Sequence, residues 1–209
     1  FGHIDVSSDR CIEPFRAFAQ RIHRHGAAIM CQISHLGRRS RADKGSWLPI
    51  VAPSATRDAL HRGFAKEMER HDITRIIADF AAAARRCREA GLDGVELLAT
   101  SHLIGQFLSP ASNRRTDAYG GSFENRCRFA QEVIEAVRDA IGDGILTLRL
   151  SGDEMLEGGL SAADCIAIAR HLSAPGRLDA LNVLGGNAVS EVGIARANSA
   201  PSRNRRSAY

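Results

Sequence analysis

Polar side chains that can bind or react with a planar ligand follow three short apolar runs of the sequence, at 27–33, 95–98 and 145–150. They are Gln32 and His35 at the first run, Thr100, His102 and Gln106 after the second, and Arg149 near the end of the third. The carboxyl ends of parallel strands share one edge of a sheet, so we expect these side chains to meet there. An amide, imidazoles and a guanidinium at one edge are typical of a site for an electron-rich planar ligand.

Gln32 and Arg149 are the candidates for direct contact with such a ligand. The amide of Gln32 offers a donor and an acceptor, which matches the edge of a pyrimidine-like ring; alternatively it is a polar residue at a strand end. Arg149 lies inside Leu-Thr-Leu-Arg-Leu, where a buried cation is costly without an anionic partner. That partner is a ligand or, in the simpler interpretation, Asp153 or Glu154.

His102 is the candidate general acid or base, since an imidazole titrates near neutral pH. The alternative for His102, and equally for His35, is an exposed loop histidine without a role. No His-Glu-x-x-His or Cys-x-x-Cys spacing occurs in the sequence, so we expect no metal site. The pairs Gly120-Gly121 and Gly158-Gly159 lack the strand, lysine and helix context of a phosphate loop.

The composition is that of a globular protein in a reducing compartment. The chain has 209 residues, a net charge of +4 and five widely spaced cysteines, which argues against a disulfide framework and favours a cytoplasmic location. No apolar run approaches the ~20 residues that span a bilayer. We expect residues 191–209, with three arginines among the last seven residues, to be a disordered basic tail that binds no nucleic acid. The first residue is not Met, and we expect the chain to be cut from a longer reading frame.

Alternating helix and strand patterns predict one domain over residues 1–190. Helical spacing of apolar residues predicts helices over 9–25, 73–90, 122–140 and 161–172, with Asp72, Ser122 and Ser161 as starting residues. Apolar runs predict strands over 27–33, 95–98, 145–150 and 178–184, and residues 40–70 are predicted as a long loop with one short helical turn. Strands alternating with helices indicate right-handed crossovers and a parallel sheet, so the fold class is α/β.

The central stretch resembles the signature of the Old Yellow Enzyme family of FMN-binding NADH:flavin oxidoreductases. The similar residues are Gln106-Phe107-Leu108-Ser109-Pro110, Ser112-Asn113-Arg114-Arg115-Thr116-Asp117 and Tyr119-Gly120-Gly121-Ser122 with Glu124-Asn125-Arg126. Cys31-Gln32-Ile33-Ser34-His35-Leu36-Gly37-Arg38 resembles the motif at that family's third strand, and Leu148-Arg149-Leu150-Ser151 the motif at its fifth. The closer resemblance is to the branch of 2,4-dienoyl-CoA reductase and trimethylamine dehydrogenase.

The resemblance implies a (β/α)8 TIM barrel that binds FMN. Gln32 would meet the pyrimidine edge of the flavin, and Arg149 its N1/O2 side. NAD(P)H would reduce the flavin, which would then reduce an activated C=C of a small-molecule substrate or, in the amine branch, oxidise an N-methyl amine. Thr100 and His102 occupy the positions of the substrate-binding histidine and the proton-donating tyrosine, and we assign substrate contacts to His35 and Gln106. The sequence between Ala99 and His102 is one residue shorter than the family pattern.

The resemblance also implies an incomplete barrel, because the four predicted strands match the third to sixth strands of the family. Four strands leave two open edges with unpaired backbone groups. The chain is then a partial reading frame, or a half-barrel that a second copy or a neighbouring chain completes. The alternative to an enzyme is a catalytically silent half-barrel or assembly module.

Overall fold

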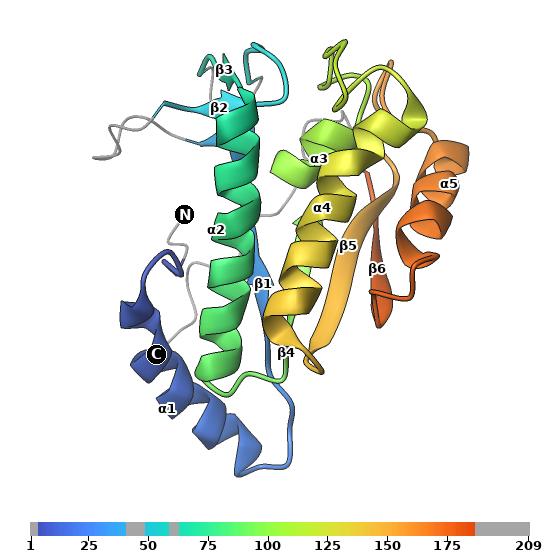
Figure 1. Cartoon of the computed structure of the whole chain (residues 1–209). Helices are drawn as coiled ribbons and strands as arrows, with labels where there is room; N and C mark the ends of the chain where they lie inside the picture. Colours follow the sequence, from blue (N-terminus) through green and yellow to red (C-terminus); the bar gives the residue numbers. More distant parts are fainter. Residues whose placement is uncertain (1–3, 41–48, 59–62, 187–209) are drawn as a thin grey trace, which may run out of the picture.

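The computed structural model describes residues 4–40, 49–58 and 63–186, and Figure 1 shows their arrangement. The helices are the 3₁₀ helix η1 (Asp9–Cys11), α1 (Ile12–His23), the 3₁₀ helix η2 (Gly37–Arg39), α2 (Arg70–Glu89), α3 (Leu103–Leu108), α4 (Phe123–Ile141) and α5 (Ala162–Ser173). The strands are β1 (Met30–Ile33), β2 (Val51–Ala52), β3 (Lys66–Glu67), β4 (Gly94–Ala99), β5 (Ile145–Asp153) and β6 (Ala180–Gly185). Each of the four predicted helices and four predicted strands is present.

The main sheet has four parallel strands in the order β1-β4-β5-β6. Strands that follow one another in this sheet are joined by α2, α4 and α5, as expected for parallel strands connected by helical crossovers. The register aligns Gln32 with Glu96 and Thr147, and it aligns Leu98 with Arg149 and Asn182. Because partners in register point to the same side of a sheet, these side chains lie on one face.

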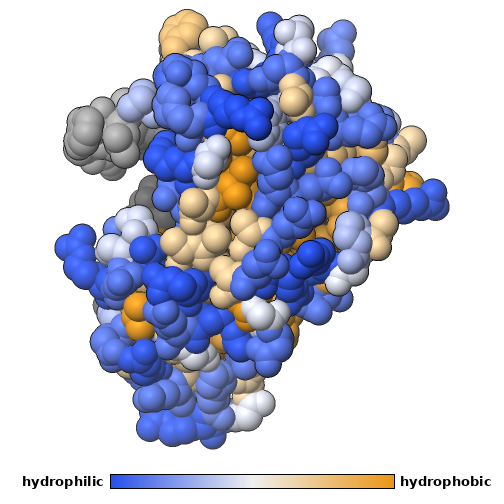
Figure 2. Space-filling model, viewed as in Figure 1, coloured by the Kyte–Doolittle hydropathy of each residue, from blue (hydrophilic) through white to orange (hydrophobic). Residues whose placement is uncertain are grey.

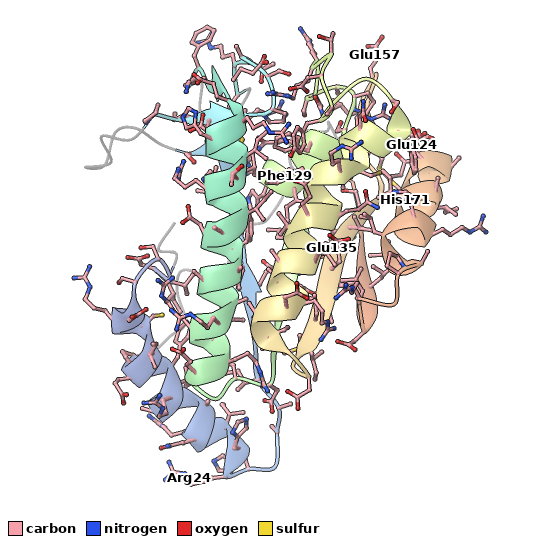
Figure 3. The ribbon with its side chains drawn as sticks, viewed as in Figure 1. Arg24, Glu124, Phe129, Glu135, Glu157 and His171 are labelled. Atoms are coloured by element: carbon pink, nitrogen blue, oxygen red, sulfur yellow. The ribbon has the colours of Figure 1, made fainter. Side chains whose placement is uncertain are left out.

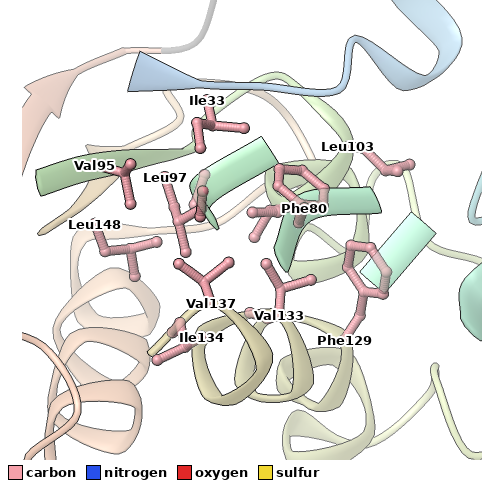
Figure 4. Packing of buried hydrophobic residues seen from close by; sticks show 14 of the residues in the cluster. Ile33, Phe80, Val95, Leu97, Leu103, Phe129, Val133, Ile134, Val137 and Leu148 are labelled. Atoms are coloured by element: carbon pink, nitrogen blue, oxygen red, sulfur yellow. The ribbon is translucent and has the colours of Figure 1, made fainter. Parts of the chain in front are cut away.

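The opposite face of the sheet carries the hydrophobic core. Val95, Leu97 and Leu148 alternate with the polar positions and pack against Phe80 of α2 and Val133 of α4 (Figure 4). Burial of an aliphatic side chain contributes about 1.5–3 kcal/mol, so this face fixes how the strands sit on the helices. Since the side-chain period of a strand is two, packing Val95 and Leu97 inward directs Glu96 and Leu98 to the other side of the sheet.

Helix starts follow the predicted pattern with one correction. The hydroxyl of Ser122 accepts a hydrogen bond from Asn125 N at 3.2 Å, and that of Ser161 from Asp164 N at 3.3 Å. The prediction that Asp72 starts its helix was wrong, because Glu69 is the N-cap and Asp72 lies in the first turn. There its carboxylate accepts from Glu69 N at 3.0 Å, so the two form a capping box.

Two segments expected as loops contain regular structure. β2 and β3 form a short parallel pair inside the predicted loop 40–70, where the described residues show strands and no helical turn. Only three residues separate the last residue of β4 from the first residue of α3. The predicted basic tail, 191–209, lies outside the described residues.

The helix-covered face is mostly hydrophilic, with hydrophobic residues in narrow patches between the helices (Figure 2). None of the helices in the described ranges combines the length and apolar character needed to cross a membrane.

Candidate functional site

The carboxylate of Glu96 is the centre of a polar cluster on the face of the sheet opposite the core. Gln32 Nε2 donates a hydrogen bond to Glu96 Oε1 at 2.6 Å, and Arg149 Nη1 lies 3.7 Å from the same oxygen. Asn182 Nδ2 donates to Glu96 Oε2 at 3.0 Å, and Thr147 Oγ1 lies 3.5 Å from it. The carboxylate therefore gathers side chains from β1, β5 and β6, which are separated by many residues in sequence.

The structure brings the two candidate ligand contacts, Gln32 and Arg149, to one carboxylate. Arg149 pairs with Glu96, so neither Asp153 nor Glu154, the partners of the simpler interpretation, is its observed partner. Glu154 is buried and accepts from Ser109 Oγ at 2.6 Å instead. The Arg149 side chain remains 33% exposed and Gln32 is exposed. Both groups are therefore reachable from the open face of the sheet.

His102 lies at the rim where β1 and β4 end. It is the N-cap residue of α3, and its Nδ1 lies 3.0 Å from the hydroxyl of Ser34, which directly follows β1. Thr100 is buried two residues earlier. α3 starts so close to this turn that a Cβ at Gly105 would lie 1.2 Å from the Thr100 carbonyl oxygen. Only glycine fits there, and the placement of His102 depends on that close approach.

Gln106 holds the loop after β1 against the loop after β4. Its Nε2 donates to the carbonyls of Leu36 and Ser101, both at 3.0 Å, and its Oε1 accepts from Arg38 N at 3.1 Å. The side chain is 1% exposed. The observed partners of Gln106 are all backbone groups, and the predicted substrate contact stays a prediction.

His35 is held as a neutral imidazole in the same loop. Its Nδ1 accepts from Gly37 N at 3.0 Å, and its carbonyl accepts from Leu103 N at 2.9 Å. Burial, followed by the charge of Arg75, lowers the pKa of His35 to about 4. An acceptor at Nδ1 places the proton of the neutral ring on Nε2, so His35 presents a neutral N–H donor around pH 7.

The central signature loop is held together by hydrogen bonds of its own Asn, Arg and Asp side chains. Asn113 Nδ2 donates to the carbonyls of Phe107 and Tyr119, both at 2.7 Å. The buried Arg115 guanidinium binds both oxygens of the Asp117 carboxylate, which lowers the pKa of that carboxyl. The loop is thereby fixed above the carboxyl ends of the strands, while the cap of α4 comes from Ser122.

Comparison with known proteins identifies the family. The sequence model of the NADH:flavin oxidoreductase / NADH oxidase family matches residues 2–206. The chain belongs to this family. The Old Yellow Enzyme family and the branch predicted from the central motif are thereby confirmed, as is the incomplete TIM-barrel sheet of four parallel strands.

The relatives are longer proteins. The chain is 45% identical over 195 residues to a probable N-methylproline demethylase of Rhizobium meliloti, covering 93% of this chain and 29% of the relative. It is 46% identical over 202 residues to a multifunctional alkene reductase/demethylase, named OYE, of Caballeronia cordobensis, covering 96% of this chain and 29% of the relative. The structure of an Old Yellow Enzyme homologue from Zymomonas mobilis superimposes with a TM-score of 0.80 at 28% identity, covering 90% of this chain and 56% of the other.

The residues on the open face fit one edge of a flavin ring. The amide oxygen of Gln32 can accept from a ring N–H, and the partly exposed guanidinium of Arg149 can donate to a ring carbonyl, so the two match a pyrimidine edge that carries N–H and carbonyl groups.

Several residues of the site were missed from sequence, among them Glu96 and Ser34. A signal for Glu96 was present, since an acidic residue between the apolar Val95 and Leu97 points to the face opposite the core. Ser34 gave no comparable signal, because its contact with His102 joins residues 68 positions apart.

Proposed function

We propose that the chain forms the catalytic-face half of an FMN-dependent oxidoreductase. It would use NAD(P)H to reduce an activated C=C of a small molecule, or oxidise an N-methyl amine. The observation that carries this proposal is the convergence of Gln32 and Arg149 on one exposed face of a sheet from this family. The names of two relatives, an alkene reductase/demethylase and an N-methylproline demethylase, support these two reaction types.

Gln32 and Arg149 are the proposed cofactor contacts. Gln32 would bind the pyrimidine edge of FMN, and Arg149 would place its cation at the N1/O2 side, where negative charge gathers on reduction. Bound FMN would supply hydride transfer between nicotinamide and substrate. A fixed cation beside developing charge needs no reorganisation during the reaction, which is why such groups favour electron transfer to the ring.

His102 and Thr100 are the proposed catalytic residues, and His102 would carry the proton. Ser34 lies beside Nδ1 of His102, and we assign the proton transfer to the other ring nitrogen, Nε2. When Nε2 gives up its proton, the remaining ring proton stays on Nδ1, which donates to the Ser34 hydroxyl in both protonation states, so the contact survives proton transfer. His35 would offer its Nε2–H to a substrate carbonyl, and Gln106 would complete the substrate side while holding the two loops together.

Titration of FMN into the purified chain tests the proposal. We expect the flavin spectrum to shift on binding, and Arg149→Ala to weaken binding about tenfold or more, because a hydrogen bond to a charged group contributes about 1.5–3 kcal/mol. Arg24→Ala is the matched control, since Arg24 is exposed at the far end of α1 (Figure 3). A chain that takes up no FMN contradicts the proposal.

The second candidate is a catalytically silent assembly module, and the outer strands of the sheet favour it. Val183 and Leu184 of β6 are 65% and 40% exposed, although their types are usually buried in a parallel sheet. A module of this kind would have a second copy of the chain as its partner, with residues 1–190 as the folded unit. A stable dimer that fails to take up FMN would support this candidate over the enzyme.

A further inference from the structure

We propose that Glu96 is a positioning residue that orients the amide of Gln32 and offsets the charge of Arg149 toward a flavin bound on this face. The inference rests on the proposed function for its flavin part only. Glu96 does not touch the proposed substrate position, since it lies in the middle of β4, six residues before His102. Its influence would pass through the two residues that contact the cofactor.

The amide of Gln32 is oriented by the hydrogen bond to Glu96. An ionised carboxylate only accepts hydrogen bonds, so the end of the amide facing it at 2.6 Å must be the Nε2 donor. The carbonyl oxygen Oε1 is then the polar atom at the other end. Without Glu96, the two ends of the amide are nearly equivalent in shape, and either can face the ligand. Glu96 therefore determines that Gln32 presents an acceptor, which suits the N–H of a pyrimidine edge.

The charge of Arg149 is partly offset by the same carboxylate. The guanidinium lies 3.7 Å from Glu96 Oε1, and the carboxylate also accepts from Asn182 and lies near Thr147. Opposite charges this close produce a much smaller field at a third group than either charge alone. The Glu96 side chain is only 17% exposed, so solvent screens it less than a surface carboxylate. Removing its charge should leave Arg149 as a full cation beside the ring.

The hydrogen bonds from Gln32 and Asn182 indicate that Glu96 positions other side chains and does not transfer a proton. Both oxygens of Glu96 accept hydrogen bonds, one from Gln32 and the other from Asn182. A general base needs an oxygen that faces the substrate, whereas a positioning group needs oxygens bound to the residues that it holds. The partners of Glu96 come from three other strands, so the carboxylate fixes these side chains relative to one another.

The first experiment needs no cofactor. In the ¹⁵N-labelled full chain, the side-chain amide signals of Gln32 are compared among wild type, Glu96→Gln, Glu96→Asp and Glu135→Gln. Glu135 is exposed on α4, on the helix-covered side of the sheet, so Glu135→Gln makes the same charge change away from the cluster (Figure 3). We expect both Glu96 variants to shift the Gln32 amide signals and the Glu135 variant to leave them unchanged. Equal Gln32 signals in Glu96→Gln and wild type would overturn the positioning role, whether or not the chain binds FMN.

The second experiment measures FMN binding in the oxidised and reduced states. We expect Glu96→Gln to raise the ratio of the dissociation constants for oxidised and reduced FMN about tenfold, which for a two-electron couple is about 30 mV toward easier reduction. Glu96→Asp keeps the charge and should leave the ratio near the wild-type value. It also serves as the informative variant if Glu96→Gln does not fold.

The outcomes separate the two proposals. A wild-type chain that takes up no FMN contradicts the proposed function, while the amide signals still decide whether Glu96 positions Gln32. If FMN binds and the ratio is the same in Glu96→Gln and Glu135→Gln, the electrostatic role of Glu96 is wrong. The same conclusion follows if Glu96→Asp changes the ratio by the amount expected for loss of the charge.

Discussion

At the scale of single residues, His102 is the group whose proposed chemistry is most directly testable. General acid catalysis contributes about 10²–10⁴-fold, so we expect His102→Phe to slow the substrate step of the FMN-loaded chain about 100-fold. Reduction of FMN by NADPH or NADH should change by less than roughly threefold, because that step needs no proton from the rim. Stopped-flow measurement of the two half-reactions separates these effects. An equal loss in both would remove His102 as the acid.

Substitutions of Ser34 test whether its hydroxyl orients the His102 ring. Ser34→Ala removes the hydroxyl beside Nδ1 and leaves the imidazole in place. If the hydroxyl orients the ring, the pH profile of the substrate step should shift in Ser34→Ala and return toward the wild-type profile in Ser34→Thr. A profile that is unchanged in both variants would show that the contact is incidental.

His35 should make the stability of the chain depend on pH. Its pKa is lowered by burial to about 4 in the folded chain, against about 6.5 in an unfolded chain. The unfolded chain therefore binds the extra proton first as pH falls. Stability is complete above about pH 6.5 and is lost toward pH 4, by at most about 3 kcal/mol. Replacing His35 by Asn, whose carbonyl can accept from Gly37 N, should flatten this slope.

Chemical denaturation at a series of pH values between 4 and 7 measures the His35 contribution. His25→Asn is the control, because His25 is exposed near the end of α1 and the same residue change is made in solvent. If His35→Asn and His25→Asn retain equal slopes, burial of His35 is not the cause of the pH dependence.

At the scale of elements, Arg115 connects the signature loop to two other segments. Its Nη1 donates to the carbonyls of Pro53 and Met68 at 2.9 and 2.8 Å, while its other nitrogens bind Asp117. A lysine keeps the charge but offers one compact group in place of the planar fork. We expect Arg115→Lys to lower the free energy of unfolding by about 2 kcal/mol or more. The exposed neighbour Arg114 supplies the control, and Arg114→Lys should stay within about 0.5 kcal/mol in the same denaturation experiment.

Elements with a long periodic pattern were predictable from sequence, and short elements were not. The pattern of Ile73, Ile76 and Phe80 predicts most of α2, since these residues form its buried face. α3 has only six residues and includes Gly105, so its helical signal is weak. β2 and β3 have two residues each, and a strand that short is defined by its partner. The predicted start of α2 was too late in the sequence. The pattern predicts Asp72 as the N-cap residue, but Asp72 is the third helical residue and forms a capping box with the true N-cap residue, Glu69.

At the scale of the whole molecule, the contacts between site residues depend on how the strands are aligned in the sheet. The sequence alone therefore predicted individual site residues but not their partners on other strands. Local patterns placed Gln32 and Arg149 at strand ends. The carboxylate between them comes from a third strand, and its hydrogen bond to Asn182 spans 86 positions. Cross-strand partners of this kind depend on which strands are neighbours and on their exact alignment, and neither is encoded in a local pattern. The contact between Ser34 and His102 was not predicted for the same reason, because it also joins residues far apart in the sequence.

The outer strands of the described sheet lead to a prediction about assembly. Val183 of β6 is 65% exposed. The cavity of about 480 Å³ beside β1 is lined mostly by apolar residues, including Phe18, which is 53% exposed, together with the polar Gln32 and Ser34. A second copy that covers these edges would remove apolar surface from water, so we expect sedimentation velocity to show a dimer that dissociates on dilution.

Val183→Lys places a charge on the outer strand β6 and should shift the monomer–dimer equilibrium toward monomer about tenfold or more. Ile166→Lys makes the same kind of change at a residue that is 52% exposed on helix α5 and not on an outer strand, and it should leave the equilibrium unchanged. A chain that sediments as a monomer at all concentrations contradicts closure by a second copy.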